Sequence, residues 1–389
     1  MSLLSEVPDD VLHAVRERLS HDAAPLSPHL VAQALREHGT PVGDATVLAV
    51  HDALRRDVVG AGPLEPLLRE DGVTDVLVNG ADSVWVDRGD GLERTSVRFG
   101  DDAAVRRLAQ RLAAAGGRRL DDASPYVDLR LPDGTRFHAV LAPLARPGTL
   151  LSLRVPRRRV FDLDELVADA VVSREGAELL AGIVERRLAF LVSGGTGSGK
   201  TTLLNALLSR ADHDDRLVLV EDASELRPDH PHVVALEARP ANIEGAGAVP
   251  LQALVRQALR MRPDRLVVGE VRGAEVVDLL AALNTGHQGG CGTIHANSAT
   301  DVPTRVESLA LVAGLTREAA HSQLASALDL VVHLDRDGRR RRLLREIGVV
   351  VRSGASGERT TVVAAVSFDD DRRWSDGPGL DRLDELFGR

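Results

Sequence analysis

The stretch Ser193–Thr202, SGGTGSGKTT, decides the fold of the second half of this chain of 389 residues. It holds the only lysine, because the other 47 basic residues (48 Lys and Arg minus this one) are arginine. The stretch fits G-x-x-x-x-G-K-[ST], the phosphate-binding P-loop pattern, which requires a strand before it and a helix after it. Both are expected here. LAFLVS reads as a buried strand, and TTLLNALLSR has helical periodicity without a helix breaker.

The residue types of this loop suit a phosphate group. Glycines let successive backbone N–H groups turn inward, and the start of the following helix adds the positive end of its dipole. Lys200 is expected to reach the β- and γ-phosphates, and the Thr201 hydroxyl to bind Mg²⁺. The wide, planar guanidinium of an arginine would not replace a compact ammonium in so tight a loop. The expected nucleotide-binding residues are Gly194, Gly195, Thr196, Gly197, Ser198, Gly199, Lys200, Thr201 and Thr202.

Composition limits the other possibilities. The length suits two or three domains, and 43% apolar with 27% charged residues is typical of a soluble globular protein. We find no apolar run near the roughly 18 residues of a membrane helix and no signal peptide, so a cytoplasmic location is expected. A single cysteine excludes an internal disulfide and a multi-cysteine zinc site. A net charge of −10 and only nine aromatic residues (six Phe, two Trp, one Tyr) argue against direct nucleic-acid binding.

The texture of the sequence changes along the chain. Residues 1–60 predict a helical segment, and 61–156 an α+β domain with short alternating strands such as TDVLVNG and YVDLRLPDGTRFHAV. A linker is expected over 157–172. Residues 173–352 alternate apolar strands with helices, which favours a mainly parallel sheet covered by helices. This region ends in a hairpin around Asp337-Gly338, and the tail 353–389 is expected at the periphery.

Three acidic residues lie at the ends of predicted parallel strands, where loops face a bound ligand in such sheets. Glu221 and Asp222 end RLVLVED, and Glu270 ends DRLVVGE. Nucleotide hydrolysis needs a metal-organising acid and a group that orients water. Gly269 stands where many P-loop ATPases carry the metal-organising Asp, so Glu221 and Glu270 are expected to divide these two roles, and the sequence leaves the division open. Asp222 could instead cap a helix.

The segment TGHQGGCGTIHANSAT, residues 285–300, reads as a polar loop after a helix. His295 is the candidate for reaching the γ-phosphate, with His287 as its companion in the segment. A lone histidine is more often structural. Cys291 has no matched set of metal ligands around it, so it is interpreted as a small buried residue.

Arginines are too common to stand out by composition. Arg136 in DGTRFHAV, Arg154 in LSLRVP and Arg272 just after Glu270 are the candidates for stabilising transition-state charge, because an arginine supplied in trans is one way to do so. The alternative is that each is a solvated surface residue. The run Arg339–Arg342 is interpreted as an exposed hairpin edge, or else as a contact for anionic lipid or an acidic partner.

Taken together, these motifs resemble one family. SGGTGSGKTT, LVEDASEL, EARPANIEGAGAV, RMRPDRLVVGEVRG and TGHQGGCGTIHANS occur in the order found in the secretion and pilus-assembly ATPases, specifically the TadA/CpaF branch related to type II and type IV secretion motors. The resemblance extends from about Gly60 to Val351. It implies a smaller α+β domain, a RecA-like P-loop ATPase domain, ATP with Mg²⁺, and a hexameric ring that works on an inner-membrane platform protein, with peripheral membrane association through partners.

The resemblance also assigns roles to residues. It maps the Walker A box to Gly194–Thr202, the Asp box to Glu221 and Asp222, an atypical Walker B box to Leu266–Glu270, and the His box to His287 and His295. Arginines that reach nucleotide phosphates in relatives would fall on Arg136 and Arg154. The small-residue stretch at 290–292 departs from the expected hydroxyl-rich His box. A RecA-like nucleic-acid translocase and a nucleotide-binding regulator with little turnover remain as alternatives.

Overall fold

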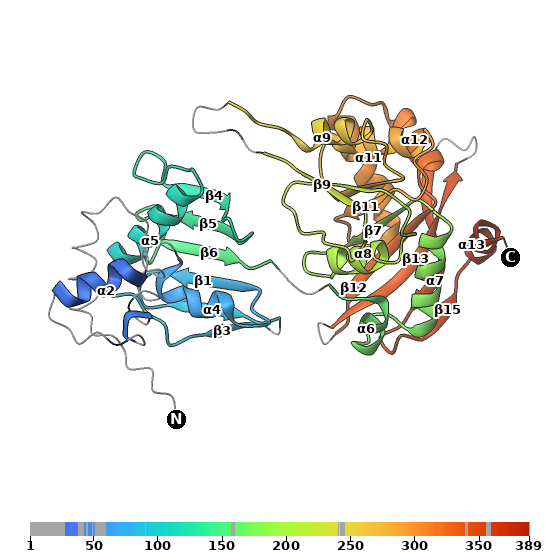
Figure 1. Cartoon of the computed structure of the whole chain (residues 1–389). Coiled ribbons are helices and arrows are strands. Elements are labelled where there is room, and N and C mark those ends of the chain that lie inside the picture. Colours follow the sequence, from blue (N-terminus) through green and yellow to red (C-terminus); the bar gives the residue numbers. More distant parts are fainter. Residues whose placement is uncertain are drawn as a thin grey trace. The chain divides into compact units, whose positions relative to one another are not determined.

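The computed structural model describes residues 28–37, 43, 46–48, 50, 60–89, 91–156, 160–239, 241, 246–338, 341–354 and 359–388. The chain forms two compact units that divide after residue 157 (Figure 1). Two helices predicted in the first 60 residues, VLHAVRERLS and ATVLAVHDALRRDVVG, lie wholly or mostly outside the described residues. The third is α2, Pro28–Glu37.

The first unit is an antiparallel six-stranded sheet in the order β3-β2-β1-β6-β5-β4. Its strands are β1 Asp75–Asn79, β2 Val84–Asp87, β3 Leu92–Arg94, β4 Tyr126–Arg130, β5 Arg136–Val140 and β6 Leu150–Arg154, and its remaining helices are the 3-10 turn η1 Gly62–Leu64, α4 Glu65–Arg69 and α5 Asp102–Ala115. Alternate strand residues such as Phe137 and Leu153 pack with Leu108 and Leu112 of α5 in one core. Asp101 caps α5 by accepting the backbone N–H of Ala104 at 2.7 Å. Period-two burial on these strands is the pattern that the sequence predicted.

The second unit contains a mixed nine-stranded sheet in the order β15-β14-β13-β12-β7-β11-β10-β8-β9. The strands are β7 Phe190–Gly194, β8 Leu217–Glu221, β9 Val233–Glu237, β10 Arg265–Val271, β11 Cys291–Ile294, β12 Leu330–Arg336, β13 Arg342–Ser353, β14 Arg359–Phe368 and β15 Trp374–Asp376. The six strands from β12 to β9 in this order are parallel. The three strands beyond β12 are antiparallel.

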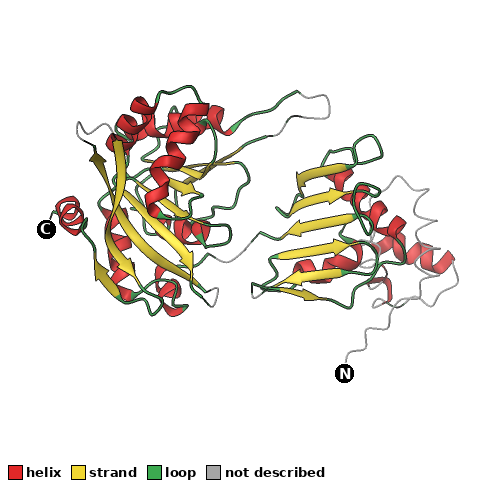
Figure 2. Cartoon of the chain, turned by 180° about the vertical axis from the view of Figure 1, so that it is seen from behind, coloured by secondary structure: helices red, strands yellow, loops and turns green. Residues whose placement is uncertain are grey.

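Helices cover both faces of this sheet (Figure 2). On one face pack α6 Leu163–Ala168, α7 Arg174–Glu185, α8 Lys200–Leu208 and α13 Leu380–Phe387. On the other pack α9 Leu251–Ala258, α10 Glu275–Leu283, α11 Val302–Val312 and α12 Arg317–Ala327, with the 3-10 turn η2 Ala299–Asp301 before α11. Neighbouring residues of β7 alternate between the two cores, with Phe190 and Val192 on one side and Leu191 on the other. The chain therefore has the α/β fold with mixed sheets that its alternating pattern predicted.

Two features differ from the sequence analysis. Residues 291–294, read as part of a polar loop, form the fully buried strand β11 between β7 and β10. The tail from residue 353, expected at the periphery, continues the sheet through β14, which pairs along most of β13. Burial of Phe368 and Phe387 in the core beside α7 explains why this segment is structural.

Candidate functional site

Four parallel strands bring the candidate residues to one edge of the sheet. β12, β7, β11, β10 and β8 are neighbours in that order, so the carboxyl ends of the last four lie side by side. The P-loop follows β7, His295 follows β11, Glu270 lies near the end of β10, and Glu221 is the last residue of β8. A crevice outside the carboxyl ends of parallel strands is where ligands bind in open α/β sheets.

The P-loop has the backbone that its glycines allow. Gly194, Gly197 and Gly199 have φ values of 148°, 71° and 99°, in the region that disfavours other residues. Helix α8 begins at Lys200 directly after Gly199. Lys200 Nζ donates to the carbonyl oxygens of Gly194 and Gly195, both at 2.9 Å. The ammonium is thus held at the mouth of the loop, while burial lowers the pKa of Lys200.

His295 and Glu270 gather around this ammonium. His295 Nε2 lies 3.2 Å from Glu270 Oε1, and the imidazole lies 3.4 Å from Lys200 Nζ. Burial and the nearby lysine charge lower the pKa of His295, so the ring is neutral at neutral pH. A neutral ring can donate Nε2–H to Glu270, and both ring nitrogens lie 3.4 Å from Lys200 Nζ. Both side chains are partly exposed, which leaves them open to a ligand.

Glu270 owes its position to an irregularity in β10. The pairing of β10 with β11 shifts register between Val268 and Val271. Thr293 Oγ1 of β11 donates to the carbonyl oxygen of Gly269 at 2.6 Å within this break. Bulges near sites redirect side chains. The break thus accompanies the projection of Glu270 toward His295.

A further carboxylate, Glu225, was missed by the sequence analysis. Its Oε2 lies 3.4 Å from the Thr201 hydroxyl, the group expected to bind Mg²⁺. The sequence carries one signal for it, an acidic residue four positions after Glu221 in EDASE. Residues 222–232 contain no helix, so the capping alternative for Asp222 is wrong.

Glu221 lies beneath the loop that carries Glu225. Its side chain is almost fully buried, and Oε1 accepts the backbone N–H groups of Glu225 and Leu226, both at 3.0 Å. Burial raises the pKa of Glu221 to about 7. A Cβ at Gly269 would lie 2.6 Å from Glu221 Cγ, so the glycine makes room for this carboxylate. An Asp at position 269 would displace Glu221, which explains the departure noted in the sequence.

The remaining acidic and arginine candidates lie in two groups. Asp222 and Arg272 pair at 2.6 Å on the surface of the second unit. Arg136 and Arg154 belong to the first unit, where they are direct partners on β5 and β6. Arg154 pairs with Asp75 at 3.2 Å, and Arg136 with Asp128 at 3.2 Å.

His287 and Cys291 do not join the cluster at Lys200. His287 precedes β11 and its Nδ1 contacts the carbonyl oxygen of Ala282 at 3.1 Å, whereas His295 follows the strand. The two histidines therefore lie beyond opposite ends of β11, whose first and last residues are about 10 Å apart at the usual rise per residue. Cys291 is buried within the sheet, and burial raises the pKa of its thiol to about 12, so it is an inert core residue.

The residues present fit a magnesium nucleotide. Among the described residues no three His, Cys, Asp or Glu side chains gather into a metal cluster. Mg²⁺ is commonly held by one or two protein oxygens together with substrate phosphates and water. Thr201 and Glu225 offer such oxygens, and Glu221 Oε2 is a buried oxygen without a hydrogen-bond partner.

Comparison with known proteins settles the family. A family model described as type II/IV secretion system protein matches residues 57–366. The chain belongs to this family. A putative conjugal transfer protein of Mycobacterium tuberculosis is 57% identical over 327 residues, which cover 82% of this chain and 93% of that protein. The type IV secretion system protein PtlH of Bordetella pertussis is 33% identical over 311 residues, covering 72% and 91%.

Solved structures show the same fold. The pilus retraction motor PilT, solved with bound ADP, has a TM-score of 0.51 at 19% identity and covers 74% of this chain and 81% of that one. The ATPase DotB of Yersinia pseudotuberculosis gives 0.51 at 19%, covering 75% and 78%. This secretion-family chain carries no helix, within its described part, that is long and apolar enough to cross a bilayer.

Proposed function

We propose that this chain is a motor ATPase that hydrolyses Mg-ATP to drive a secretion, conjugation or Tad-like pilus-assembly apparatus. The observation that carries the proposal is the cluster of Lys200, His295 and Glu270 at the mouth of a P-loop. The secretion ATPase family supports the reaction class, and the relatives from conjugal transfer and type IV secretion support the process. A RecA-like domain in the second unit is part of the proposal.

In this proposal the P-loop binds the phosphates. The backbone N–H groups of residues 194–202 cradle them, and Lys200 releases the carbonyl oxygens of Gly194 and Gly195 to bind a phosphate oxygen. These carbonyls hold the ammonium in place beforehand, so little ordering is required when the nucleotide binds. Among the described residues, no carboxylate forms a salt bridge with the Lys200 ammonium. Its positive charge is therefore available to the ligand.

Thr201 and Glu225 then form the metal side of the site, and Mg²⁺, when bound, neutralises charge on the phosphates. Glu221 positions Glu225 through two backbone N–H groups. Glu270 orients the attacking water or accepts its proton. His295 holds Glu270 in place and faces the γ-phosphate. This division makes Glu270 the base and Glu225 a metal contact, where the sequence left the two roles open between Glu221 and Glu270. Asp222 and Arg272 form a supporting pair.

The proposed assembly is a homo-hexamer at the inner face of the cell membrane, acting on an inner-membrane platform protein. Arg136 and Arg154 are the proposed trans arginines of this ring. Their cross-strand pairing places two guanidiniums at one end of the sheet of the first unit. Both are exposed, so their present carboxylate partners stabilise them little and can be exchanged for phosphate.

The testing experiment measures steady-state turnover of Mg-ATP together with mass in solution, with and without single-stranded DNA. DNA-independent turnover by a six-subunit species supports the motor. Turnover that appears only with DNA would instead favour a nucleic-acid translocase. Binding of nucleotide without turnover would favour a regulator.

A Lys200→Ala variant provides the matched control, because it removes the only lysine and leaves the backbone cradle. We expect at least a hundredfold loss of nucleotide affinity or turnover, because the variant loses the charged hydrogen bonds from the ammonium to the phosphates. Unchanged turnover in this variant would contradict the whole assignment of the site.

A further inference from the structure

The β12–β13 hairpin packs directly against the P-loop. β12 runs parallel to β7, and Leu334 is the register partner of Gly194. A Cβ at Gly194 would lie 2.4 Å from the Leu334 carbonyl oxygen, so backbone meets backbone here. Ser193 Oγ and His333 Nδ1 are hydrogen-bonded at 2.8 Å within the buried part of this contact. The loop is thus braced by a hairpin more than 130 residues away in the sequence.

Two arginines of the hairpin converge on one P-loop oxygen. Arg336 Nη2 donates to the carbonyl oxygen of Gly197 at 2.9 Å, and Arg342 Nε donates to the same oxygen at 3.0 Å. They are direct cross-strand partners. Like charges at such positions destabilise a strand pair. The shared acceptor offsets this repulsion, so the placement of both charges follows from the P-loop rather than from the stability of the hairpin.

The loop is shaped to receive these arginines. Gly197 has a φ of 71°, and a Cβ on it would lie 2.7 Å from Arg336 Nη2. A Cβ on Gly199 would lie 3.3 Å from Arg342 Cδ. Any larger residue at position 197 would therefore both strain the backbone and displace a guanidinium.

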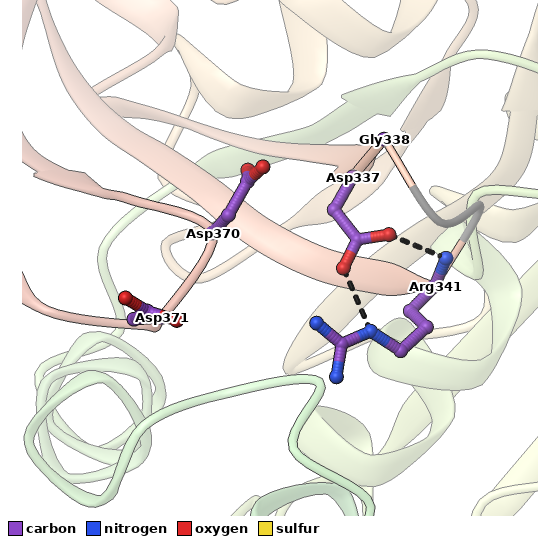
Figure 3. Close-up of a pocket in the computed structure, with 5 residues that line it drawn as sticks. All are labelled: Asp337, Gly338, Arg341, Asp370 and Asp371. Carbon is purple, nitrogen blue, oxygen red and sulfur yellow. Dashed lines mark hydrogen bonds and ion pairs between the residues drawn. The ribbon is translucent and has the colours of Figure 1, made fainter.

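The tip of the hairpin fixes the two arginines relative to each other. Asp337, whose side chain is buried, accepts from Arg341 N and Nε, both at 2.8 Å (Figure 3). Asp337 N–H in turn donates to the Arg341 carbonyl oxygen at 2.9 Å. These bonds lie beside a pocket of about 320 Å³ that Asp370 and Asp371 also line. Since Arg336 and Arg342 directly flank this closed tip, their spacing is set before any ligand binds.

We propose that Arg336 and Arg342 are positioning residues of the P-loop, which set the Gly197–Ser198 peptide for binding the β-phosphate of ATP or ADP. The inference rests on the proposed function. In a planar trans peptide the C=O and N–H point in opposite directions. Guanidiniums on the Gly197 oxygen therefore hold the Ser198 N–H on the other side, where it now donates to the Gly195 carbonyl oxygen at 3.3 Å across the loop.

The two arginine hydrogen bonds to the Gly197 oxygen also make the Ser198 N–H a stronger donor. Hydrogen bonds in a chain polarise one another, so a carbonyl that accepts two charged donors makes its own N–H partner more acidic. Inward N–H groups of this kind form the anion-binding nest of a P-loop. Because the backbone cradle serves the phosphates that ADP and ATP share, both nucleotides should depend equally on the arginine pair.

The test compares Arg336→Ala, Arg342→Ala and the double variant with two references in the full chain. Arg352→Ala is the matched control, because Arg352 lies at the other end of β13 and, among the described residues, its side chain donates to the exposed Ser326 Oγ at 3.1 Å. Lys200→Ala tests the P-loop itself. The probe is fluorescent Mg-ADP in an equilibrium titration, followed by Mg-ATP turnover and the thermal shift that each nucleotide induces.

We expect about a twofold weaker Kd for each single variant and about tenfold for the double, because one arginine partly replaces the other on a shared oxygen. ADP and ATP should lose affinity together, KM should rise more than kcat falls, and unfolding without nucleotide should match the Arg352→Ala control. A double Lys variant, which keeps two charged donors, should recover most of the affinity. The single Ala variants carry the test if the double Ala variant does not fold.

Wild-type affinity in the double Ala variant would overturn the inference. So would a loss confined to ATP, because that would indicate a direct contact with the γ-phosphate. Either result, with Lys200→Ala still inactive, leaves the proposed function standing. A normal Lys200→Ala variant would instead remove the proposed function and the inference with it.

Discussion

At the scale of single residues, the sequence pointed to most of the cluster and missed Glu225. Lys200, Glu270 and His295 were predictable because a motif or a strand end marks each of them, and the structure brings their side chains together. Glu225 was not, because its place beside Thr201 depends on how the loop after β8 folds back. That return is directed by Glu221, whose burial no local pattern announces.

Glu270→Gln should separate binding from chemistry. The amide keeps the shape of the side chain but cannot accept a proton, so we expect Kd for ATP to change little and kcat to fall by about a hundredfold or more. Single-turnover and steady-state assays check this. Asp222→Asn is the matched control, because it neutralises a carboxylate in the surface pair with Arg272. Normal turnover in Glu270→Gln would move the base to another carboxylate of the site.

Glu221 should make the stability of the nucleotide-free protein depend on pH. Its folded pKa of about 7 lies above the ordinary value of 4.5, because burial penalises the charge. The folded state therefore binds the proton more tightly. This stabilisation is fully present below about pH 4.5 and is lost as pH rises through 7, by about 3 kcal/mol at most.

The Glu221→Gln variant carries no such titration. Denaturant unfolding at pH 5 and pH 8 should show that the variant gains stability relative to the wild type at the higher pH, by up to about 3 kcal/mol. A pH-independent difference between the two proteins would contradict the raised pKa. Added Mg-ATP tests the same group, because a cation beside the carboxylate would favour its charged form.

At the scale of elements, the strand that the sequence missed is explained by packing. β11 has four residues, and Gly292 has little intrinsic strand preference. A Cβ at this position would lie 2.5 Å from the Val268 carbonyl oxygen of β10. The close approach of β10 requires a glycine, and the same glycine hides the strand from a reading of propensity. In longer apolar strands such as β8 and β10, residue preference and packing agree, and these strands were predicted correctly.

A buried ion pair joins the starts of β8 and β10. Arg265 Nε donates to Asp215 Oδ2 at 2.7 Å, and both side chains are about 2% exposed. Arg187 donates to the other oxygen of Asp215. Removal of one partner leaves a buried charge uncompensated, so Asp215→Ala should lower the free energy of unfolding by about 3–5 kcal/mol.

The control for this variant is Asp264→Ala. Asp264 is exposed, and within the described part of the chain its side chain accepts the backbone N–H of Arg216 at 2.8 Å. Its loss should cost about 1 kcal/mol or less. If the two variants lower the free energy of unfolding equally in denaturant, the buried ion pair contributes no more than an exposed hydrogen bond.

At the scale of the whole molecule, the sequence predicted two types of unit but placed the end of the second too early. Residues 353–359 are rich in Gly, Ser, Arg and Glu, which reads as the end of a domain. The chain then re-enters the sheet as β14, and the family match likewise extends to residue 366. The addition of β14 beyond β13 cannot be seen locally, because it depends on an unpaired edge of a sheet that is formed mostly from earlier strands.

The C-terminal helix α13 should therefore stabilise the second unit. Phe387 is 6% exposed, its ring lies 4.5 Å from the Arg186 guanidinium, and its carbonyl oxygen accepts from Arg186 Nε at 3.2 Å. Phe387→Ala removes buried ring contacts and leaves a cavity, at a cost of about 3–5 kcal/mol. Arg382→Ala on the same helix breaks an exposed pair with Glu385 and should cost well under about 1 kcal/mol. Thermal unfolding of both variants tests this. Similar midpoints would show that the tail is peripheral, whereas a lower midpoint for Phe387→Ala alone would show that the tail belongs to the core that carries the P-loop.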